Sequence, residues 1–253
     1  MSYKVASVDS ALTVLEAVAE NPGVGVTRLA ELTGKTKSQV FRLLYTLEAR
    51  GYLVKDAESS SYNLGYQTIL LGEAAKRQTD LVRLALPIMK ELTEETSETS
   101  HLIIRDGLHS LCVAIVEGPL PVRLYAKVGR RGPLHAGGGS KVMLAYAPDD
   151  VIEQVLSSEL ERHTDATITD RSELEEVLEQ IRRDGYHVAI SDVDEGAFSV
   201  AAPIRDHLGN VVAAVTVAGP ETRLTAESGP RLVEAARRAA AKVSRLLGYT
   251  GEG

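Results

Sequence analysis

Apolar residues in the first fifty positions recur every three or four residues, which is the spacing of amphipathic helices. The pattern over residues 8–19 predicts a first helix that ends at the Asn21-Pro22-Gly23 turn. A short second helix is expected over residues 28–33, with Thr27 as its cap and Gly34 as the turn after it. The chain therefore begins with two helices joined by a short turn.

A third helix is predicted over residues 36–50. Thr36 and Gln39 have the spacing of a capping box, in which each side chain satisfies a backbone amide at the helix start, and Gly51 can end the helix. The apolar face of this helix consists of Val40, Leu43, Leu44 and Leu47. The opposite face consists of Ser38, Arg42, Tyr45 and Ala49.

Two helices joined by a tight glycine turn, the second beginning with polar and basic residues, have the layout of a helix-turn-helix. Residues 52–55 and 61–64 are β-prone segments around a polar turn, and they predict a hairpin directly after the third helix. A hairpin in this position is the wing of a winged helix-turn-helix. For the helices alone, a small bundle with a solvated polar face is the alternative, which the hairpin disfavours.

The third helix is expected to enter the major groove of DNA, because its exposed face carries basic and hydrogen-bonding side chains. Side chains expected at bases or nearby phosphates are Lys37, Ser38, Gln39 and Arg42. Further expected DNA contacts are Thr27, Arg28, Lys35, Thr36 (mainly a cap), Tyr45, Lys55, Ser59, Ser60 and Ser61. One such module contacts few base pairs, so we expect a dimer on a near-palindromic site of double-stranded DNA.

Beyond the hairpin, the pattern changes to a mixture of helices and strands. Helices are predicted over residues 66–79 (a linker), 81–92 (kinked or restarted at Pro87), 140–146, 149–156, 170–185 and 225–247. Strands are predicted around an Asp106-Gly107 turn within 101–117, and at 122–127, 186–191, 198–204 and 210–218. About six antiparallel strands with helices on their faces form an α+β architecture. The expected domains are therefore 1–65, winged helix-turn-helix; 66–79, linker helix; and 80–253, a sensing domain.

Charge is distributed unevenly along the chain. The 28 basic and 35 acidic residues give a formal net charge of −7, which excludes a cationic coat over the whole protein. Residues 28–55 nevertheless hold six bases against two acids, as expected for a small domain that faces an anion. Chance clustering of surface bases is the alternative on charge alone.

The remaining composition predicts a cytoplasmic protein. Apolar runs reach only about ten residues, half the length of a membrane helix, and the first 25 residues lack the apolar segment of a signal peptide. The single cysteine, Cys112, excludes an internal disulfide and a cysteine-based zinc site. We expect no cofactor and no metal.

The segment TGKTKSQVFRLLYTLEARGYLVKDAESSSYNLG, residues 33–65, resembles the winged-helix domain of the IclR-type family of bacterial transcriptional regulators. Residues 129–145, 184–204 and 209–220 resemble further blocks of that family, in the same order and spacing. The resemblance implies a GAF-like C-terminal domain that binds a small effector, in many members a keto, hydroxy or aromatic acid. It also implies pairing into a dimer of dimers; we expect residues 8–19 and the linker helix to supply dimer contacts.

A glycine run, Gly137-Gly138-Gly139, stands just before a predicted helix, where unpaired backbone amides can bind a carboxylate or phosphate. The spacing of a nucleotide-binding P-loop is absent, so we expect a small organic acid rather than a hydrolysed nucleotide. The alternative is that these glycines only permit a tight turn against the sheet. In the resembling family the effector lies between the sheet and this segment.

A second candidate cluster, Asp192, Asp194 and Glu195, matches an acidic segment of the family's pocket. Asp192 matches the last acid of the family pattern, but Ala189 stands where the first is expected, which implies a different ligand. Solvated loop acids are the alternative for Asp194 and Glu195. The expected effector-binding residues are Ala136, Gly137, Gly138, Gly139, Asp192, Ser199 and Thr216.

The sequence shows no catalytic constellation. Cys112 lies between apolar neighbours in a predicted strand, which is typical of a buried thiol. The six histidines lack metal-ligand spacing, and His135 is expected to pack, with a pocket wall or a metal ligand as its alternatives. We therefore predict a ligand-responsive transcriptional regulator and no enzyme. The alternatives are a small-molecule-binding enzyme or storage protein whose winged helix contacts protein, and a structural subunit without a ligand.

Overall fold

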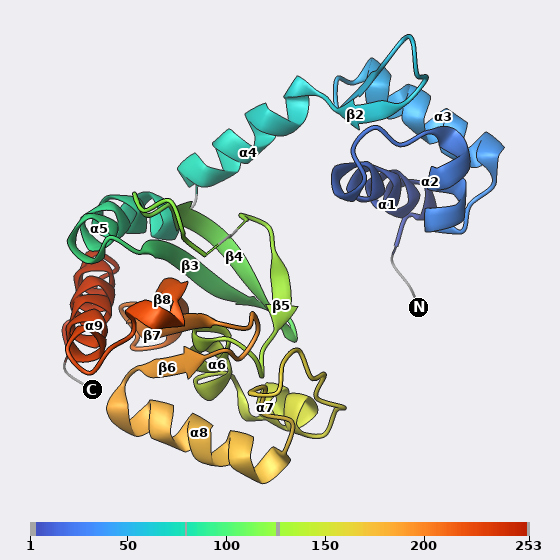
Figure 1. The fold of residues 1–253 in the computed structure, drawn as a ribbon. Helices are drawn as coiled ribbons and strands as arrows, with labels where there is room; N and C mark the ends of the chain where they lie inside the picture. Colours follow the sequence, from blue (N-terminus) through green and yellow to red (C-terminus); the bar gives the residue numbers. More distant parts are fainter. Residues whose placement is uncertain (1–3, 79, 125–126, 252–253) are drawn as a thin grey trace. The chain divides into compact units, whose positions relative to one another are not determined.

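The computed structural model describes residues 4–78, 80–124 and 127–251. The chain divides into two compact units, Met1–Thr79 and Asp80–Gly253 (Figure 1). Buried apolar side chains form one hydrophobic cluster in the N-terminal unit and two in the C-terminal unit. Each unit thus has the internal packing of a domain.

The N-terminal unit consists of α1 (Ala6–Glu20), α2 (Val26–Thr33), α3 (Lys37–Ala49), β1 (Leu53–Lys55), β2 (Tyr62–Leu64) and α4 (Tyr66–Gln78). The apolar faces of the first three helices meet the hairpin in one core, in which Val14, Leu29 and Leu44 are fully buried. Gly34 follows α2 in the left-handed conformation, with φ at 65°, as the turn requires. The helix-turn-helix and its wing are therefore present.

The start of α2 differs from the sequence expectation. The helix begins at Val26 with Gly25 at the N-cap, and no side chain caps it, so the prediction of Thr27 as the cap is wrong. The cause lies outside the helix: the backbone of Val24 pairs with Tyr62 of the hairpin, with a 2.9 Å hydrogen bond from the Tyr62 amide. This pairing holds the chain extended up to Gly25, and the helix starts immediately afterwards.

The C-terminal unit has a six-stranded antiparallel sheet in the order β5-β4-β3-β8-β7-β6. Its strands are β3 (Thr99–Asp106), β4 (His109–Val116), β5 (Arg131–Pro133), β6 (His187–Ile190), β7 (Ala197–Arg205) and β8 (Val211–Pro220). Its helices are α5 (Asp80–Thr96), α6 (Gly138–Ala145), α7 (Asp149–Leu156), α8 (Arg171–Asp184) and α9 (Ser228–Leu246), with a 3-10 turn at Glu221–Arg223.

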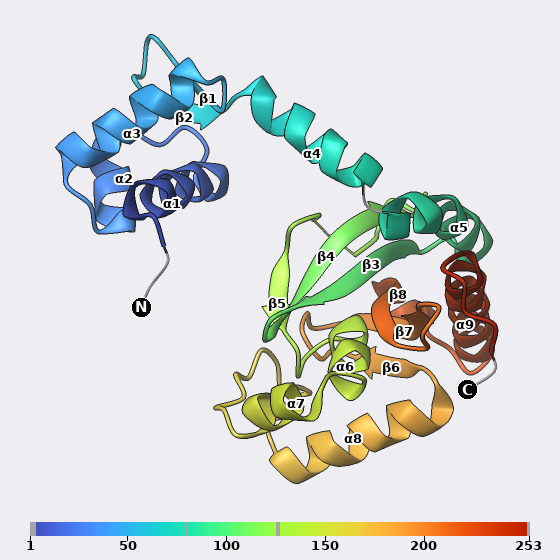
Figure 2. The ribbon, with the colours of Figure 1, turned by 180° about the vertical axis from the view of Figure 1, so that it is seen from behind.

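Helices cover both faces of this sheet. One apolar cluster packs α5 and α9 on one face, and a second packs α6, α7 and α8 on the other (Figures 1 and 2). Phe198 and Val200 of β7 belong to the first cluster and the neighbouring Ala201 to the second, as alternation along a strand requires. The predicted α+β architecture is confirmed.

The predicted strand over residues 122–127 is wrong for the residues that can be described: 122–124 and 127 lie outside any strand, and 125–126 lie outside the described residues. Pairing with β4 starts later in the chain. The Gly129 amide donates to the Cys112 carbonyl, and the Cys112 amide donates to the Arg130 carbonyl. The edge strand is therefore β5, which follows this contact, so the sheet still has six strands.

Two helix starts also shift. The last helix begins at Ser228 instead of residue 225, because Thr225 and Ser228 exchange side-chain and backbone hydrogen bonds of 2.8 and 3.1 Å ahead of it. In the opposite direction, α6 begins at Gly138, within the glycine run rather than after it. Among the described residues, no helix has the length and apolarity to cross a membrane.

The capping box generates a stability prediction. Replacing Thr36 with Ala should destabilise the N-terminal unit by about 1 kcal/mol, because the Gln39 amide loses its acceptor. Urea unfolding monitored by hydrogen-exchange mass spectrometry resolves the two units and measures this change. Thr27→Ala is the matched control, and it should cost less than about 0.5 kcal/mol because Thr27 is exposed and caps nothing. Equal losses in both variants would contradict the observed cap assignment.

Candidate functional site

The first candidate site is the exposed face of α3, beginning at its capping box. The Gln39 amide donates to Thr36 Oγ1 over 3.3 Å, and the Thr36 amide donates to Gln39 Oε1 over 3.0 Å. The Thr36 hydroxyl also donates to Gln39 Oε1 over 3.1 Å. The carboxamide oxygen of Gln39 is therefore engaged in holding the helix start, and its amino group remains to donate outward.

The other residues predicted on this face are exposed. Ser38, Arg42 and Tyr45 all face solvent, and neither Lys37 nor Arg42 has an acidic partner within the described chain. Arg28 on α2 differs, because it forms a 3.0 Å ion pair with Glu31. Phe41 was not among the predicted residues; it is 53% exposed one turn before Tyr45 and adds an aromatic ring to this face. The sequence feature that points to Phe41 is its apolar side chain at a position outside the apolar face of α3.

The wing is a hydrogen-bonded turn. Asp56 Oδ1 accepts from the Glu58 and Ser59 amides and from the Ser59 hydroxyl, at 2.8 to 3.0 Å. These bonds, chiefly those from Ser59, lower the pKa of Asp56. Ser59 and Ser61 share a further 2.8 Å bond, while Ser60 stands at the tip with a positive φ of 55°. Ser59 and Ser61 thus build the turn, and Ser60 is the predicted wing serine without such a bond.

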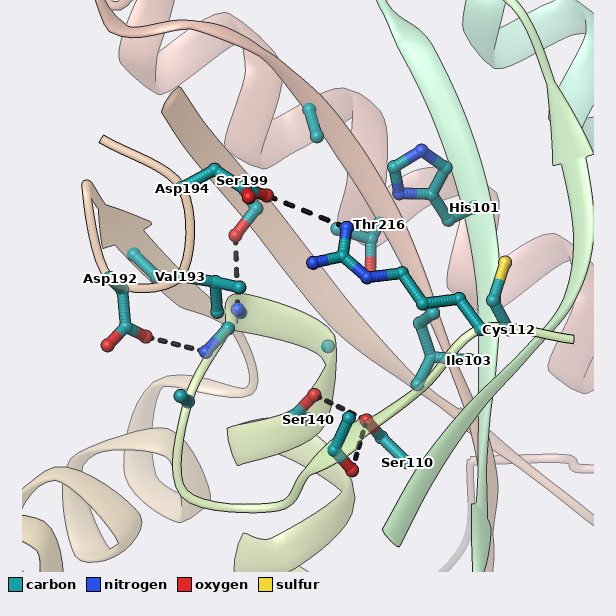
Figure 3. A pocket seen from close by; sticks show the side chains of 18 of the residues that line it. His101, Ile103, Ser110, Cys112, Ser140, Asp192, Val193, Asp194, Ser199 and Thr216 are labelled. Atoms are coloured by element: carbon teal, nitrogen blue, oxygen red, sulfur yellow. Dashed lines mark hydrogen bonds and ion pairs between the residues drawn. The ribbon is translucent and has the colours of Figure 1, made fainter. Parts of the chain in front are cut away.

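The second candidate site is a cavity of about 460 Å³ in the C-terminal unit. It lies between the sheet and the segment that leads into α6, and Figure 3 shows it from close by. All residues that the sequence assigns to effector binding line it: Ala136, Gly137, Gly138, Gly139, Asp192, Ser199 and Thr216. The structure thus brings together positions that span eighty residues of sequence.

Two of the glycine amides are already occupied. The Gly137 amide donates to Asp192 Oδ2 over 2.6 Å, and the Gly138 amide donates to Ser199 Oγ over 3.0 Å. The expectation of unpaired amides is therefore wrong for these two glycines. A Cβ atom would lie 2.7 Å from Ser199 Oγ at Gly138, and 2.8 Å from Ile103 Cγ1 at Gly139. The glycines permit a close approach of α6 to the sheet, which was the alternative reading of the run.

Asp192 is held by a buried cation. Its carboxylate lies 2.8 Å from Lys141 Nζ of α6, and these side chains are 5% and 3% exposed. The same oxygen that accepts from Gly137 makes this pair, while Asp192 Oδ1 has no partner among the described groups. Asp192 thus anchors the loop between β6 and β7 to the start of α6. Lys141 was not among the predicted site residues, because only the fold brings it to Asp192.

The floor of the cavity carries polar groups without partners. His101 of β3 and Thr216 of β8 are register partners, and both are buried. Neither His101 Nε2 nor Thr216 Oγ1 has a hydrogen-bond partner among the described residues. Burial, and secondly the charge of Arg130, lowers the pKa of His101 to about 4, so its imidazole is neutral at neutral pH. These groups can donate to, or accept from, a bound molecule (Figure 3).

Two other candidate reactive groups, Cys112 in the cavity lining and His135 outside it, are unreactive or packed. Burial raises the pKa of the Cys112 thiol to about 11, so it stays protonated at neutral pH. His135 stacks on His163 with ring centroids 6.0 Å apart, and its Nε2 lies 2.9 Å from the Glu161 carbonyl oxygen. In the part of the chain that the structure describes, no three His, Cys, Asp or Glu side chains are grouped to hold a metal.

Comparison with known proteins decides the family. Residues 7–57 match the IclR helix-turn-helix domain, and residues 73–245 match the bacterial transcriptional regulator IclR C-terminal domain. This chain belongs to the IclR family. The regulator KipR of Bacillus subtilis is 34% identical over 251 residues, covering 99% of this chain and 100% of KipR. The regulator KdgR of Escherichia coli is 33% identical, covering 97% of this chain and 94% of KdgR.

Solved IclR structures agree in fold. An IclR regulator from Alicyclobacillus acidocaldarius matches with a TM-score of 0.91 at 28% identity, over 97% of this chain and 100% of that one. An IclR homologue from Microbacterium hydrocarbonoxydans, solved with 4-hydroxybenzoate, matches with a TM-score of 0.84 at 26% identity, over 95% and 98%. The chain is a transcriptional regulator with a helix-turn-helix DNA-binding domain and a C-terminal effector-binding domain. This agrees with the transcriptional regulator that its sequence predicts.

The buried pair in this IclR chain generates a double-variant prediction. Asp192→Asn leaves Lys141 without a counter-charge and should destabilise the C-terminal unit by about 3–5 kcal/mol. Adding Lys141→Met removes that charge, and Asn still offers an acceptor to Gly137, so stability should recover substantially. Urea unfolding of the C-terminal unit measures both. A double variant no more stable than Asp192→Asn would refute a charge-based role for the pair.

The neutral histidine generates a pH prediction. The pKa of His101 in the folded protein is about 4, below the usual 6.5. Its contribution to stability is therefore fully present at neutral pH and is lost as the pH falls from 6.5 toward 4, because the unfolded chain takes up the proton first. His101→Gln should therefore weaken the acid destabilisation of the C-terminal unit. Unfolding free energies at several pH values test this, with the exposed His207→Gln as control. Identical pH profiles for wild type and His101→Gln would contradict it.

Proposed function

We propose that this regulator binds a near-palindromic operator in double-stranded DNA as a dimer or dimer of dimers in the cytoplasm, and that a small organic acid in the C-terminal cavity modulates this binding. The observation that carries the DNA-binding half is the polarity of α3. Its apolar face, with Val40 and Leu44, is buried in its own domain, while Arg42 stays exposed and free of acidic partners in the described chain. That arrangement suits a helix that inserts into the major groove.

The contacts follow from the exposed faces of the N-terminal unit. Ser38, Arg42 and Tyr45 would read base edges, and the amino group of Gln39 would donate hydrogen bonds beside them. Ser60 and Lys55 would track the backbone from the wing. The remaining proposed contacts are Thr27, Arg28, Lys35, Thr36, Lys37, Ser59 and Ser61. Arg28 would first have to leave Glu31.

Exposed apolar residues on two helices support self-association. Val8 and Leu12 of α1 are 55% and 51% exposed, and Ile69 and Leu70 of α4 are 59% and 61% exposed. Apolar side chains at this density on a small domain favour burial against another chain. A second copy is the partner that a palindromic site requires, because each half-site needs its own α3.

The cavity supports the effector half of the proposal. Its volume of about 460 Å³ falls in the range of small-molecule sites, and the cationic Lys127, Arg130 and Arg131 line it. A related structure that holds 4-hydroxybenzoate makes a carboxylic acid a reasonable class of ligand. The effector must bind the DNA-bound and free states with different affinities, because only differential binding shifts an equilibrium.

The DNA prediction concerns Arg42. Arg42→Ala should weaken binding to the operator by about 1–3 kcal/mol, because the residue loses its contacts with a base and neighbouring phosphate. Fluorescence anisotropy with DNA from immediately upstream of the gene, titrated with salt, measures this loss. The exposed Arg50→Ala, at the far end of α3, is the matched control. Unchanged affinity in Arg42→Ala would remove that residue from the interface, and binding insensitive to salt would overturn the proposed DNA contact.

A further inference from the structure

One ion pair crosses the effector cavity. Arg130 precedes β5, Asp194 lies in the loop between β6 and β7, and both side chains line the cavity. Their closest charged atoms are 3.6 Å apart, and the side chains are 48% and 47% exposed (Figure 3). This distance exceeds that of a charge-assisted hydrogen bond, and half-exposed pairs contribute little to stability. Arg130 is thus a cation whose present partner is easily exchanged.

Unsatisfied groups lie in the same region of the cavity. His101 and Thr216 line it, and they are 93% and 97% buried, since their exposed fractions are 7% and 3%. Arg130 lines the same cavity as His101 and Thr216, and its guanidinium reaches Asp194 across it, so one ligand can contact the cation and both orphan groups; the charge of Arg130 also lowers the pKa of His101. Buried polar groups without partners are costly, and a bound oxygen anion would satisfy them.

We propose that the effector carboxylate binds Arg130, the Thr216 hydroxyl and His101 Nε2, and that it displaces Asp194 from Arg130. This inference rests on the proposed effector function and adds two points to it. It assigns the anion subsite to the sheet side of the cavity rather than to the glycine amides, of which Gly137 and Gly138 are occupied. It also makes Asp194 an internal competitor of the ligand.

The exchange has a defined structural consequence. Asp192 remains anchored by Lys141 and Gly137, and Ser191 is held by the Thr164 hydroxyl at its carbonyl and by Glu221 at its hydroxyl. When Asp194 loses Arg130, residues 193–195 lose this side-chain contact, while the Ala197 amide still donates to the Asp194 carbonyl and the Gly196 amide to Ser191 Oγ. Ligand binding at this subsite should therefore change the β6–β7 loop around Asp194, while the glycine turn and α6 keep their positions.

The test uses the full chain and pairs of acids and their amides. Acetate, pyruvate, benzoate and 4-hydroxybenzoate are compared with acetamide, pyruvamide, benzamide and 4-hydroxybenzamide by thermal shift and calorimetry. We expect at least one acid to bind and its amide to bind at least about tenfold more weakly. Arg130→Gln should lower the affinity for that acid by about tenfold or more, and Thr216→Val should lower it several-fold.

Asp194→Asn distinguishes the exchange from simple attraction. This substitution should raise the affinity for the acid by about threefold or more, because the competing carboxylate is gone while the cation remains. Asp165→Asn, an exposed carboxylate outside the cavity lining, controls for the change in net charge and should leave affinity unchanged. Since Arg130 and Asp194 are half-exposed, the ligand-free melting temperatures of their variants should stay close to that of the wild type.

Each failure points to a different conclusion. Equal binding of acid and amide, no binding of any acid, or no gain in Asp194→Asn beyond that in Asp165→Asn would each overturn this inference. If amides bind and release the protein from its operator, the proposed effector cavity stands and only the anion subsite is wrong. If neither acids nor amides bind while operator binding persists, the effector half of the proposed function fails together with the subsite, and the DNA-binding half stands.

Discussion

At Gly138 and Gly139 the start of α6 approaches the sheet so closely that no side chain fits between them. This approach fixes the depth of the cavity, because it sets how far the helix stands from the floor formed by β3, β7 and β8. The Lys141–Asp192 pair holds the same turn from the opposite side and ties it to the β6–β7 loop. The shape of the binding site therefore depends on this close approach of backbone to sheet, and its loop depends on the buried ion pair beside it.

The features predictable from sequence are those that short-range rules determine. The Thr36–Gln39 box and the Gly34 turn depend on residues at most three positions apart, and both are present. The start of α2 was missed, because it depends on pairing between Val24 and the distant Tyr62. The edge strand was missed for the same reason, since β-prone residues at 122–124 lose their place beside β4 to residues that follow Gly129.

The candidate site divides in the same way. Family matching identified positions that line the cavity, including Ser199 and Thr216, although two of the glycine amides and Asp192 are engaged within the protein. The roles of Lys141, His101 and Arg130 could not be predicted from spacing, because the groups that they face lie on other strands and loops. The whole chain is acidic, whereas the cavity lining holds the cations Lys127, Arg130 and Arg131 against the carboxylates Asp192 and Asp194.

The capping box on α3 constrains how this regulator can change its operator. Gln39 holds the start of the helix with its oxygen, so a substitution at this position alters the folding of the domain together with any base contact. Ser38, Arg42 and Tyr45 are exposed and carry no such structural duty. Under the proposed DNA contact, new operator preferences are accessible first through these three positions, whereas a change at residue 39 requires a compensating cap elsewhere. The capping role of Gln39 thus limits which substitutions in α3 can change the DNA sequence preference without destabilising the helix.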